Sequence, residues 1–420
     1  MQLVAGTSNS GKIKRMQAAL SPIGIEVLPP KLAVSLSEDG RTVEENAEQK
    51  ATAHVLKLGV PVLASDEALV LDGIPLDQQP GTQVRRFGRD NHRANDEEMV
   101  AYYSDLFQRH GGSVTGHWKY AFSLAFPNGY CRTFSLFTPD RLFVATPCPT
   151  RVSGFPISSL QIESTTGKYV AELTLNETNR IWYRVYIKPL QKFVIKSMTE
   201  LILHDLDAMG SERNREGMAR FGINIKRAYG TSVSNLRRYS RPYRNCHPLA
   251  IELWKSKIHE ARIMAGIIEN HNQVTEAQMD RWTADFDSWD VCDETCLNLF
   301  SKIDIAPRKA EEWSGRAPEF EKRAGLALMA TLTVHRRDLP DEVFLRFLTL
   351  IEKEAIDERN FVKKAAVWAL RQVGNHNINL RKHTIETARR LKNSNSKSAR
   401  WVGSRALREL QPLQTVSAHI

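Results

Sequence analysis

Helical periodicity, repeated through the second half of the chain, constrains the fold more than any other feature of the sequence. From about residue 196 onward, Leu, Ala, Ile and Met recur three and four positions apart, which is the pattern of helices that bury one face. The segments that show it are LILHDLDAM, LAIELWKSKIHEARIMAGII, FEKRAGLALMATLTVH, DEVFLRFLTLIEKEAI and FVKKAAVWALRQVG. Helix pairs return at intervals of roughly 35 to 45 residues, which predicts a solenoid of stacked helical hairpins.

The first part of the chain carries a different pattern. Gln2–Ala5 is an apolar strand signal, and a helix is predicted from about Lys12 to Leu20. Further strand signals are IEVLPP, PVLASDEALVLDG, KYAFSLAFPNG and RLFVAT. We therefore expect a multidomain chain, with an α/β mixed-sheet domain over residues 1–195 and an all-α domain of HEAT-like repeats over residues 196–420. A chain of 420 residues is also longer than one hydrophobic core usually serves.

Composition and charge indicate where the protein is located and which partners it binds. The five cysteines are odd in number and scattered, so no disulfide scaffold is expected and the cytoplasm is the predicted location. No apolar run approaches the roughly 20 residues that span a bilayer, so we expect no membrane partner and no secretion signal. Of the net charge of +10, residues 1–195 contribute +2 and residues 196–420 contribute +8. A basic second half favours nucleic acid, because Lys and Arg displace counterions from phosphate.

A polar loop near the N-terminus is similar to a phosphate-binding loop. Gly6–Ile13 reads GTSNSGKI and has the P-loop spacing except at Ile13, where a hydroxyl group should hold Mg²⁺. A strand, a Gly-containing loop and a helix start can still bind an anion, because the first N–H groups of a helix point toward it. An ordinary turn between strand and helix is the alternative interpretation.

Five segments in order resemble the inosine triphosphate pyrophosphatase family, which hydrolyses noncanonical purine nucleoside triphosphates to monophosphates. They are TSNSGK, SEDGRTVEENAEQKA (37–51), ASDEALVLDG (64–73), PGTQVRRFG (80–88) and GKYVAELT (167–174). The resemblance covers about residues 1–190. It implies a purine nucleoside triphosphate as ligand and Mg²⁺ as cofactor when the domain is active, since a metal neutralises the phosphates and activates water. It also allows a homodimer through this domain.

This resemblance assigns roles by position. Glu38 and Asp66 would bind the metal, and Asp66 would also be the catalytic base. The nucleotide-binding roles fall on Thr7, Asn9, Lys12, Lys50, Lys168 and Arg184.

Several positions depart from the family pattern. Arg15 stands in place of a Glu, Ser65 in place of an Asp, and Glu67–Ala68 in place of Ser-Gly. The purine-reading segment Phe-Gly-Tyr-Asp is Phe155–Ser158 here, and Ser-His-Arg is Trp182–Arg184. These departures predict altered metal and purine recognition. A changed substrate, or a binding or dimerisation role, is the alternative.

In the second half, Trp289 and Asp293 lie four positions apart and therefore share a helical face. As an isolated pair they would be a core Trp and a capping or exposed Asp. Their stretch resembles, however, the Trp-x-x-x-Asp site of the HEAT-like alkylpurine DNA glycosylases. Arg323 in FEKRAGLA and Trp368 in FVKKAAVWALR match that family in order. GMARFGIN and LWKSKIHEARIMA resemble its opening helices, so the resemblance covers about residues 197–412.

The glycosylase resemblance implies excision of alkylated purines from duplex DNA without a cofactor. The catalytic roles would fall on Asp293, Trp289, Trp368 and Arg323. A carboxylate can stabilise the oxocarbenium-like sugar that forms as the base leaves, and Trp rings can face a cationic base. Backbone phosphates of the DNA would be contacted by Arg323, Lys363, Lys364 and Arg371.

Three functions remain open from the sequence. The first is a DNA glycosylase fused to a pyrophosphatase-like domain, the second is a noncatalytic DNA-binding scaffold, and the third is activity in the N-terminal half alone. Cys292 and Cys296 share a helical face at a spacing that a metal could use, but no second ligand pair accompanies them. We expect these two to be buried thiols.

Overall fold

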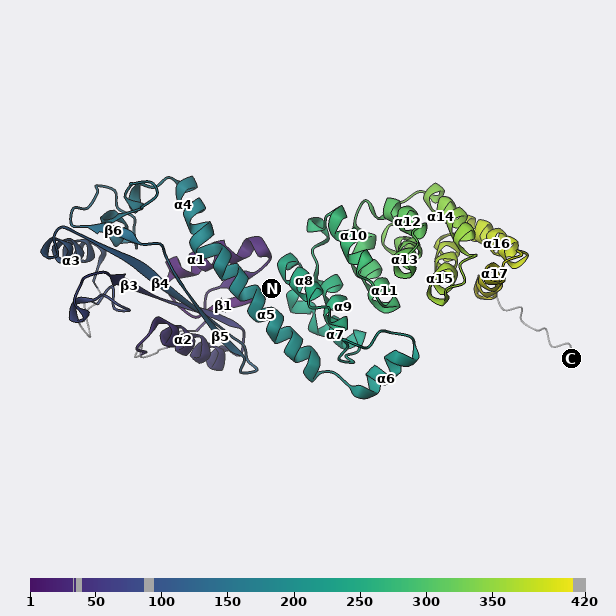
Figure 1. Cartoon of the computed structure of the whole chain (residues 1–420), viewed down its shortest axis with the longest axis horizontal. Helices are drawn as coiled ribbons and strands as arrows, with labels where there is room; N and C mark the ends of the chain where they lie inside the picture. Colours follow the sequence, from purple (N-terminus) through teal and green to yellow (C-terminus); the bar gives the residue numbers. More distant parts are fainter. Residues whose placement is uncertain (33, 35–39, 87–93, 411–420) are drawn as a thin grey trace. The chain divides into compact units, whose positions relative to one another are not determined.

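The computed structural model describes residues 1–32, 34, 40–86 and 94–410. It divides into two compact units, Met1–Leu201 and Ile202–Ile420 (Figure 1). The predicted fold class is confirmed, because the first unit contains a mixed sheet and the second consists of helices. Helix α5 (Lys188–Ala208) runs through the position where the sequence predicted the boundary, and the division at residue 195 stays a prediction. None of the helices in these ranges is both long and apolar enough to cross a membrane.

The first unit is built on a seven-stranded sheet within the described residues. Its strands are β1 (Gln2–Ala5), β2 (Glu26–Leu28), β3 (Val62–Leu71), β4 (Ser113–Ala125), β5 (Cys131–Phe137), β6 (Arg141–Val144) and β7 (Gln161–Ile162). The order is β2-β1-β3-β4-β6-β7, and β5 also pairs with β4. The pairs of β1 with β2 and β3 are parallel and the others are antiparallel.

The long pair of β3 and β4 gives the sheet two different faces. Their antiparallel register sets Asp66 opposite Ala121 and Glu67 opposite Tyr120. Because neighbouring side chains in a strand point to opposite faces, Asp66 and Glu67 project to different sides of the sheet. Ala121 packs in a small apolar cluster with residues of α2 (Val43–Leu58). The Asp66 face is therefore the face that α2 covers.

Helices of the first unit begin at defined caps. In α1 (Ser10–Leu20) the Asn9 side chain accepts the N–H groups of Gly11 and Lys12, which satisfies two donors that a helix start leaves free. Capping boxes open α3 (Asp96–Arg109) and α4 (Leu175–Trp182). A π-helical turn at Tyr183–Ile187 joins α4 to α5. Such turns concentrate at functional sites in proteins.

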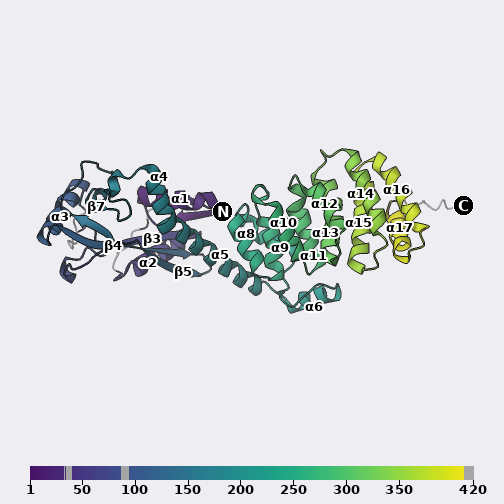
Figure 2. The same ribbon diagram turned by 45° about the horizontal axis from the view of Figure 1, so that its top comes forward.

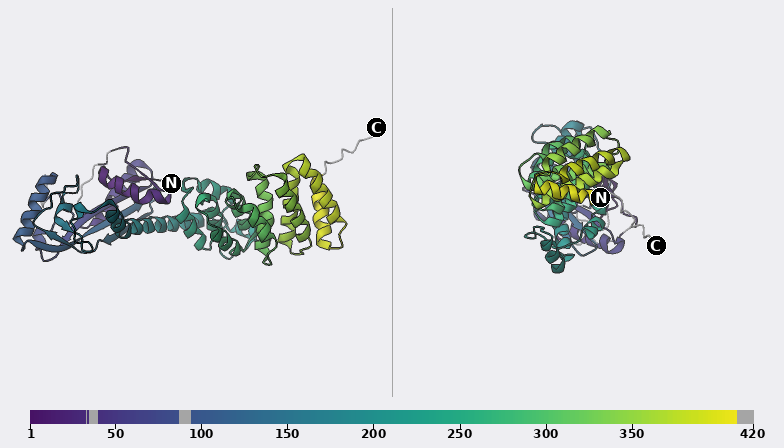
Figure 3. Two further views of the ribbon diagram at one scale, coloured as in Figure 1. Left: turned by 90° about the horizontal axis from the view of Figure 1, so that it is seen from above. Right: turned by 90° about the vertical axis from the view of Figure 1, so that its right-hand side faces the viewer.

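The second unit is a stack of helices in two layers (Figures 1 and 2). After α6 (Glu212–Arg220) and α7 (Val233–Tyr239), one layer holds α8 (His247–Lys255), α10 (Glu276–Ala284), α12 (Ala306–Ser314), α14 (Asp341–Glu354) and α16 (Ile378–Lys392). The other, which we call the site layer, holds α9 (His259–Ile268), α11 (Trp289–Asn298), α13 (Glu319–His335), α15 (Asn360–His376) and α17 (Lys397–Leu410). Figure 3 shows these helices stacked side by side, which confirms the predicted HEAT-like arrangement.

Candidate functional sites

Asp66 lies at the centre of a polar cluster in the first unit. Lys50 of α2 donates to its Oδ1 (2.8 Å), and Asn46 donates to its Oδ2 (3.0 Å). Lys12 of α1 lies 3.9 Å from the same carboxylate. Three of the residues that the sequence assigned to one nucleotide site, Asp66, Lys12 and Lys50, are therefore together.

Glu67 forms a second cluster on the opposite face of the strand. Lys12 Nζ lies 3.6 Å and Arg15 Nη2 lies 3.4 Å from its carboxylate. Burial alone would raise the pKa of Glu67, but Lys12 and Arg15 hold that pKa below its usual value. The Arg15 guanidinium also stands over the rings of Phe155 (5.0 Å) and Trp182 (6.0 Å). Glu67 is thus an ionised carboxylate held between two cations.

The described carboxylates do not by themselves provide a magnesium site. Mg²⁺ needs an octahedral set of oxygens supplied in part by carboxylates, whereas Asp66 and Glu67 are each paired with a Lys or Arg side chain. In the described ranges, no group of three His, Cys, Asp or Glu side chains could hold a metal. Glu38, the other predicted metal ligand, lies outside the described residues.

The remaining predicted nucleotide-binding residues are more scattered. Thr7 and Asn9 lie in the loop before α1, where Thr7 Oγ1 accepts the N–H of Asn9 and the Asn9 side chain caps the helix. Lys168 pairs with Glu177 at 2.8 Å. Arg184 is exposed on the π-helical turn. No hydrogen bond or ion pair between described residues joins Lys168 or Arg184 to Asp66, and their roles stay predictions.

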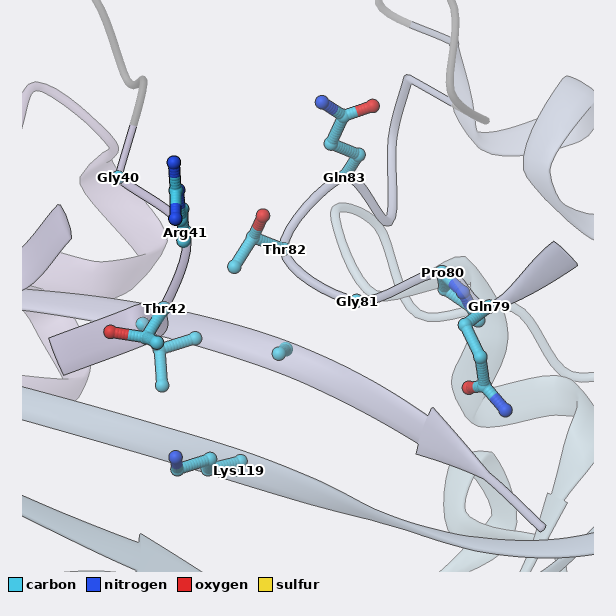
Figure 4. A pocket seen from close by; sticks show the side chains of 11 residues that line it. Gly40, Arg41, Thr42, Gln79, Pro80, Gly81, Thr82, Gln83 and Lys119 are labelled. Carbon is cyan, nitrogen blue, oxygen red and sulfur yellow. The ribbon is translucent and has the colours of Figure 1, made fainter. Parts of the chain in front are cut away.

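A cavity of about 490 Å³ lies between the segment before α2, strands β3 and β4 and the loop Gln79–Gln83 (Figure 4). Its walls are the segment Gly40–Val43, which leads into α2, Ala68 of β3, the loop Gln79–Gln83 and Lys119 of β4. Ala68 follows Asp66 by two positions and shares its face of the strand. Two segments that carry the pyrophosphatase resemblance, 37–51 and 80–88, contribute to these walls. This cavity therefore opens on the same face of the strand as Asp66.

Asp293 and Arg323 form the core of the candidate site in the second unit. Arg323 of α13 donates through Nε to Oδ1 (2.9 Å) and through Nη2 to Oδ2 (2.6 Å) of Asp293 on α11. Its third nitrogen donates to the Phe361 carbonyl (2.6 Å). Side-chain exposure is 6% for Arg323 and 18% for Asp293. The guanidinium is thus committed to positioning Asp293, which leaves it little access to the DNA phosphate that the sequence assigned to it.

Burial shapes the acidity of this carboxylate. It raises the pKa of Asp293 above the usual value, and the Arg323 guanidinium opposes that rise. Both carboxylate oxygens accept one hydrogen bond from Arg323, and a carboxylate offers about four acceptor positions. Asp293 therefore retains acceptor capacity toward a ligand or a water molecule.

Two of the predicted tryptophans flank this pair differently. The Trp289 ring centroid lies 5.8 Å from the Arg323 guanidinium, and its Nε1 donates to the Phe221 carbonyl (3.2 Å) after α6. Trp368 is half-buried on α15 in the same layer. No hydrogen bond or ring contact between described residues joins Trp368 to Asp293, so its role stays a prediction.

A buried pair fixes the start of α11. His259 Nε2 is hydrogen-bonded to Asp290 Oδ2 (2.9 Å), and Ser288 donates to the other oxygen of Asp290. Burial alone would lower the pKa of His259, but the hydrogen bond to Asp290 raises it above the usual value. Because Asp290 directly follows Trp289, this pair orients the first turn of α11.

The basic residues of α15 are not equivalent. Lys364 is exposed. The Lys363 ammonium stands 5.3 Å from the ring centroid of Trp401 on α17, and Arg371 pairs with Glu409 at 2.7 Å.

The sequence analysis did not single out Trp401, although its spacing from Lys397 repeats that of Trp368 from Lys364. The sequence analysis also did not predict the contact between Arg15 and Glu67. Each of these two residues was noted there only as a departure from the family pattern.

The N-terminal half is similar to known pyrophosphatases. Residues 3–185 match the model of the Ham1 family. A dITP/XTP pyrophosphatase of Deinococcus deserti is 30% identical over 44% of this chain and 84% of the relative. The enzyme of that name from Geobacter sulfurreducens is 32% identical over 44% of this chain and 90% of its own length. The structure of a HAM1 protein from Coxiella burnetii is 22% identical, with a TM-score of 0.40, over 47% of this chain and 99% of that chain.

The C-terminal half matches a different group. Residues 202–410 match the model described as DNA alkylation repair enzyme. A solved structure from a family related to the HEAT-like repeat DNA glycosylases, with affinity for branched DNA structures, is 18% identical. Its TM-score is 0.44, and it covers 50% of this chain and 94% of that chain. Both predicted resemblances are confirmed: the chain belongs to the Ham1 family through its N-terminal half and carries a HEAT-like DNA alkylation repair domain in its C-terminal half.

Proposed function

We propose that the DNA alkylation repair domain is a glycosylase that excises alkylated, cationic purines from duplex DNA. The observation that carries this proposal is the bidentate pair of Asp293 and Arg323 beside Trp289. It sets an oriented carboxylate and an aromatic ring on one helix of the site layer, α11, with the guanidinium supplied by the adjacent helix α13. The basic excess of the second half, +8 of the net +10, supports DNA as the partner.

Excision of an alkylated purine requires few catalytic groups. Alkylation of a purine ring nitrogen gives the base a positive charge and makes it a good leaving group, so a strong general acid is not required. The developing charge is on the sugar, and a carboxylate held in a partly buried place stabilises it more than one in water. The free acceptor positions of Asp293 can orient the attacking water. The Trp289 ring can face the cationic base.

Arg323 has a positioning role in this proposal. Two parallel N–H donors fix the plane of the Asp293 carboxylate, and the third donor ties the guanidinium to α15 through Phe361. Arg323 on α13 therefore connects Asp293 on α11 to the start of α15. The contacts to DNA phosphates are left to exposed residues such as Lys364.

Release of 7-methylguanine from methylated duplex DNA tests the proposal. We expect release by the full-length protein, and a loss of at least about 100-fold in Asp293→Asn, because the amide keeps the shape and loses the charge. Glu294→Gln is the matched control, since Glu294 follows on the same helix and pairs with Arg237 instead. Equal release by the wild type and Asp293→Asn would reject the proposal. Salt-sensitive DNA binding without any release would favour the scaffold alternative.

For the Ham1 domain we propose a noncanonical purine nucleoside triphosphate as ligand and pyrophosphate release as the activity. The relatives of Deinococcus deserti and Geobacter sulfurreducens, named dITP/XTP pyrophosphatase, support this ligand class. The cluster of Asp66, Lys12 and Lys50 supports a phosphate-binding place beside a carboxylate. Pyrophosphate release from inosine or xanthosine triphosphate, lost in Asp66→Asn, is the expected result. No release from either nucleotide would count against the activity.

A further inference from the structure

Three side chains that depart from the Ham1 pattern meet at one place in the first unit. Arg15 comes from α1, Glu67 from β3 and Trp182 from the end of α4. Arg15 is 3.4 Å from Glu67 and lies over the Trp182 ring. Unrelated changes at positions so far apart in the sequence would have no reason to lie in contact. We therefore treat the three residues as one rebuilt part of the site.

The rebuilt part changes the sign of the local charge. The Asp66 and Glu67 clusters share Lys12, and together they have three cations, Lys12, Arg15 and Lys50, and two carboxylates, Asp66 and Glu67. The pattern of the family, with Glu at position 15, Asp at 65 and Ser at 67, would have two cations and three carboxylates.

A divalent cation is attracted by an excess of carboxylate oxygens. Among the described charged residues of the two clusters, cations outnumber carboxylates. A triphosphate, in contrast, is attracted by ammonium and guanidinium groups, which form short charge-assisted hydrogen bonds to its oxygens. The cluster in this chain therefore suits the anion directly and not a metal that would bridge to it.

Arg15 also has an unused donor. Its Nε is buried and has no hydrogen-bond partner among the described residues. A buried donor without a partner costs about 1–3 kcal/mol, and a phosphate oxygen would satisfy it. The side chains of Lys12, Arg15 and Lys50 are 15%, 21% and 12% exposed. Their charges act in a partly desolvated place, where attraction for an anion is stronger than in water.

We propose that the Ham1 domain binds the phosphate chain of its nucleotide without a divalent cation, and that Arg15 supplies the positive charge that a metal would otherwise bring. This inference rests on the proposed triphosphate ligand of the same domain. It concerns binding, and it makes Arg15 the residue that distinguishes this site from the pattern of its relatives.

Titration calorimetry of the full-length protein with inosine triphosphate tests the proposal, once in EDTA and once in excess MgCl₂. We expect the Kd in EDTA to be as low as in MgCl₂, within about threefold. In the double variant Arg15→Glu/Glu67→Ser, which restores the family pattern at these two positions, we expect binding in EDTA at least about tenfold weaker than in MgCl₂. Lys14→Glu is the control, because it reverses a charge on the exposed side of α1.

Each outcome of this experiment has one meaning. Wild-type binding that is at least about tenfold weaker in EDTA overturns the metal-free proposal and leaves the triphosphate ligand standing. A double variant that binds equally in both buffers overturns the role given to Arg15, provided that its thermal unfolding matches the wild type. No binding in either buffer rejects the triphosphate ligand itself, and the metal-free proposal with it.

Discussion

Removal of Arg323 should change both the stability of the protein and its base release. Arg323→Ala leaves the Asp293 carboxylate 18% exposed without a counter-charge, so we expect the free energy of unfolding to fall by about 3 kcal/mol. The pKa of Asp293 should rise further, because the guanidinium that opposes the effect of burial is gone. Urea unfolding measures the first effect, and the pH dependence of base release measures the second.

The neighbouring ion pair offers a matched control, because Glu294 directly follows Asp293 on α11. Arg237→Ala removes the partner of Glu294 at the surface, and the free energy of unfolding should change by less than about 1 kcal/mol. Arg323→Lys keeps the charge but cannot make two parallel hydrogen bonds. An Arg323→Lys protein with wild-type base release would contradict the positioning role.

The buried pair of His259 and Asp290 predicts a pH dependence of stability. The pKa of His259 is raised in the folded state, so its contribution is complete below its unfolded value of about 6.5 and is lost as the pH rises through the folded pKa. The stability difference between wild type and His259→Gln should therefore shrink with rising pH, by at most about 1.4 kcal/mol per pH unit. Urea unfolding at pH 5.5 and at pH 8.5 compares the two proteins, and a difference that grows with pH would contradict the assignment.

At the scale of single helices, α15 offers a test of DNA contact. Lys364 is exposed and has no ion pair in the described ranges, so Lys364→Ala should reduce the slope of log affinity against log salt by about 0.9. Arg371 already pairs with Glu409, and Arg371→Ala should change that slope less. Fluorescence anisotropy with a labelled duplex at several salt concentrations measures both. A larger effect of Arg371→Ala would show that the pair with Glu409 opens on DNA.

The elements show what the sequence could and could not predict. Strand β1 and helix α1 follow from local apolar patterns and appear as expected. The run of residues 249–268 looked continuous but is two helices, because the chain turns at Lys257 with φ of 60°. Strand β5 was not predicted, although CRTFSLF alternates polar and apolar residues. Short turns and edge strands depend on tertiary contacts that a local pattern does not contain.

The side chains of the candidate sites were also predictable only in part. Helical spacing placed Trp289 and Asp293 on one face, and their proximity to Arg323 follows from the resemblance in motif order. The burial of Arg323 does not, since an Arg side chain is usually exposed. The contact of Arg15 with Glu67 joins positions 52 residues apart. Only the pairing of β1 with β3, which brings the start of α1 to the middle of β3, sets these two side chains within reach.

Across the whole molecule, charge and chemistry are divided between the two units. The basic excess is concentrated at the end of the solenoid, where α16 and α17 carry nine Lys and Arg residues against two Glu. The first unit is nearly neutral, and its cations are grouped around Asp66 and Glu67. Long-range attraction of DNA should therefore depend on the second unit, and nucleotide binding on a local cluster in the first.

This division predicts that the two activities can be removed one at a time in the full-length protein. Lys12→Ala should weaken binding of inosine triphosphate at least about tenfold, because it removes a cation shared by Asp66 and Glu67, and it should leave release of 7-methylguanine unchanged. Asp293→Asn should do the opposite. The residues of each site come from one compact unit, so neither change removes a contact from the other site. Calorimetry and the excision assay on the same two preparations measure all four quantities, and a loss of base release in Lys12→Ala would show instead that nucleotide binding and base excision are coupled.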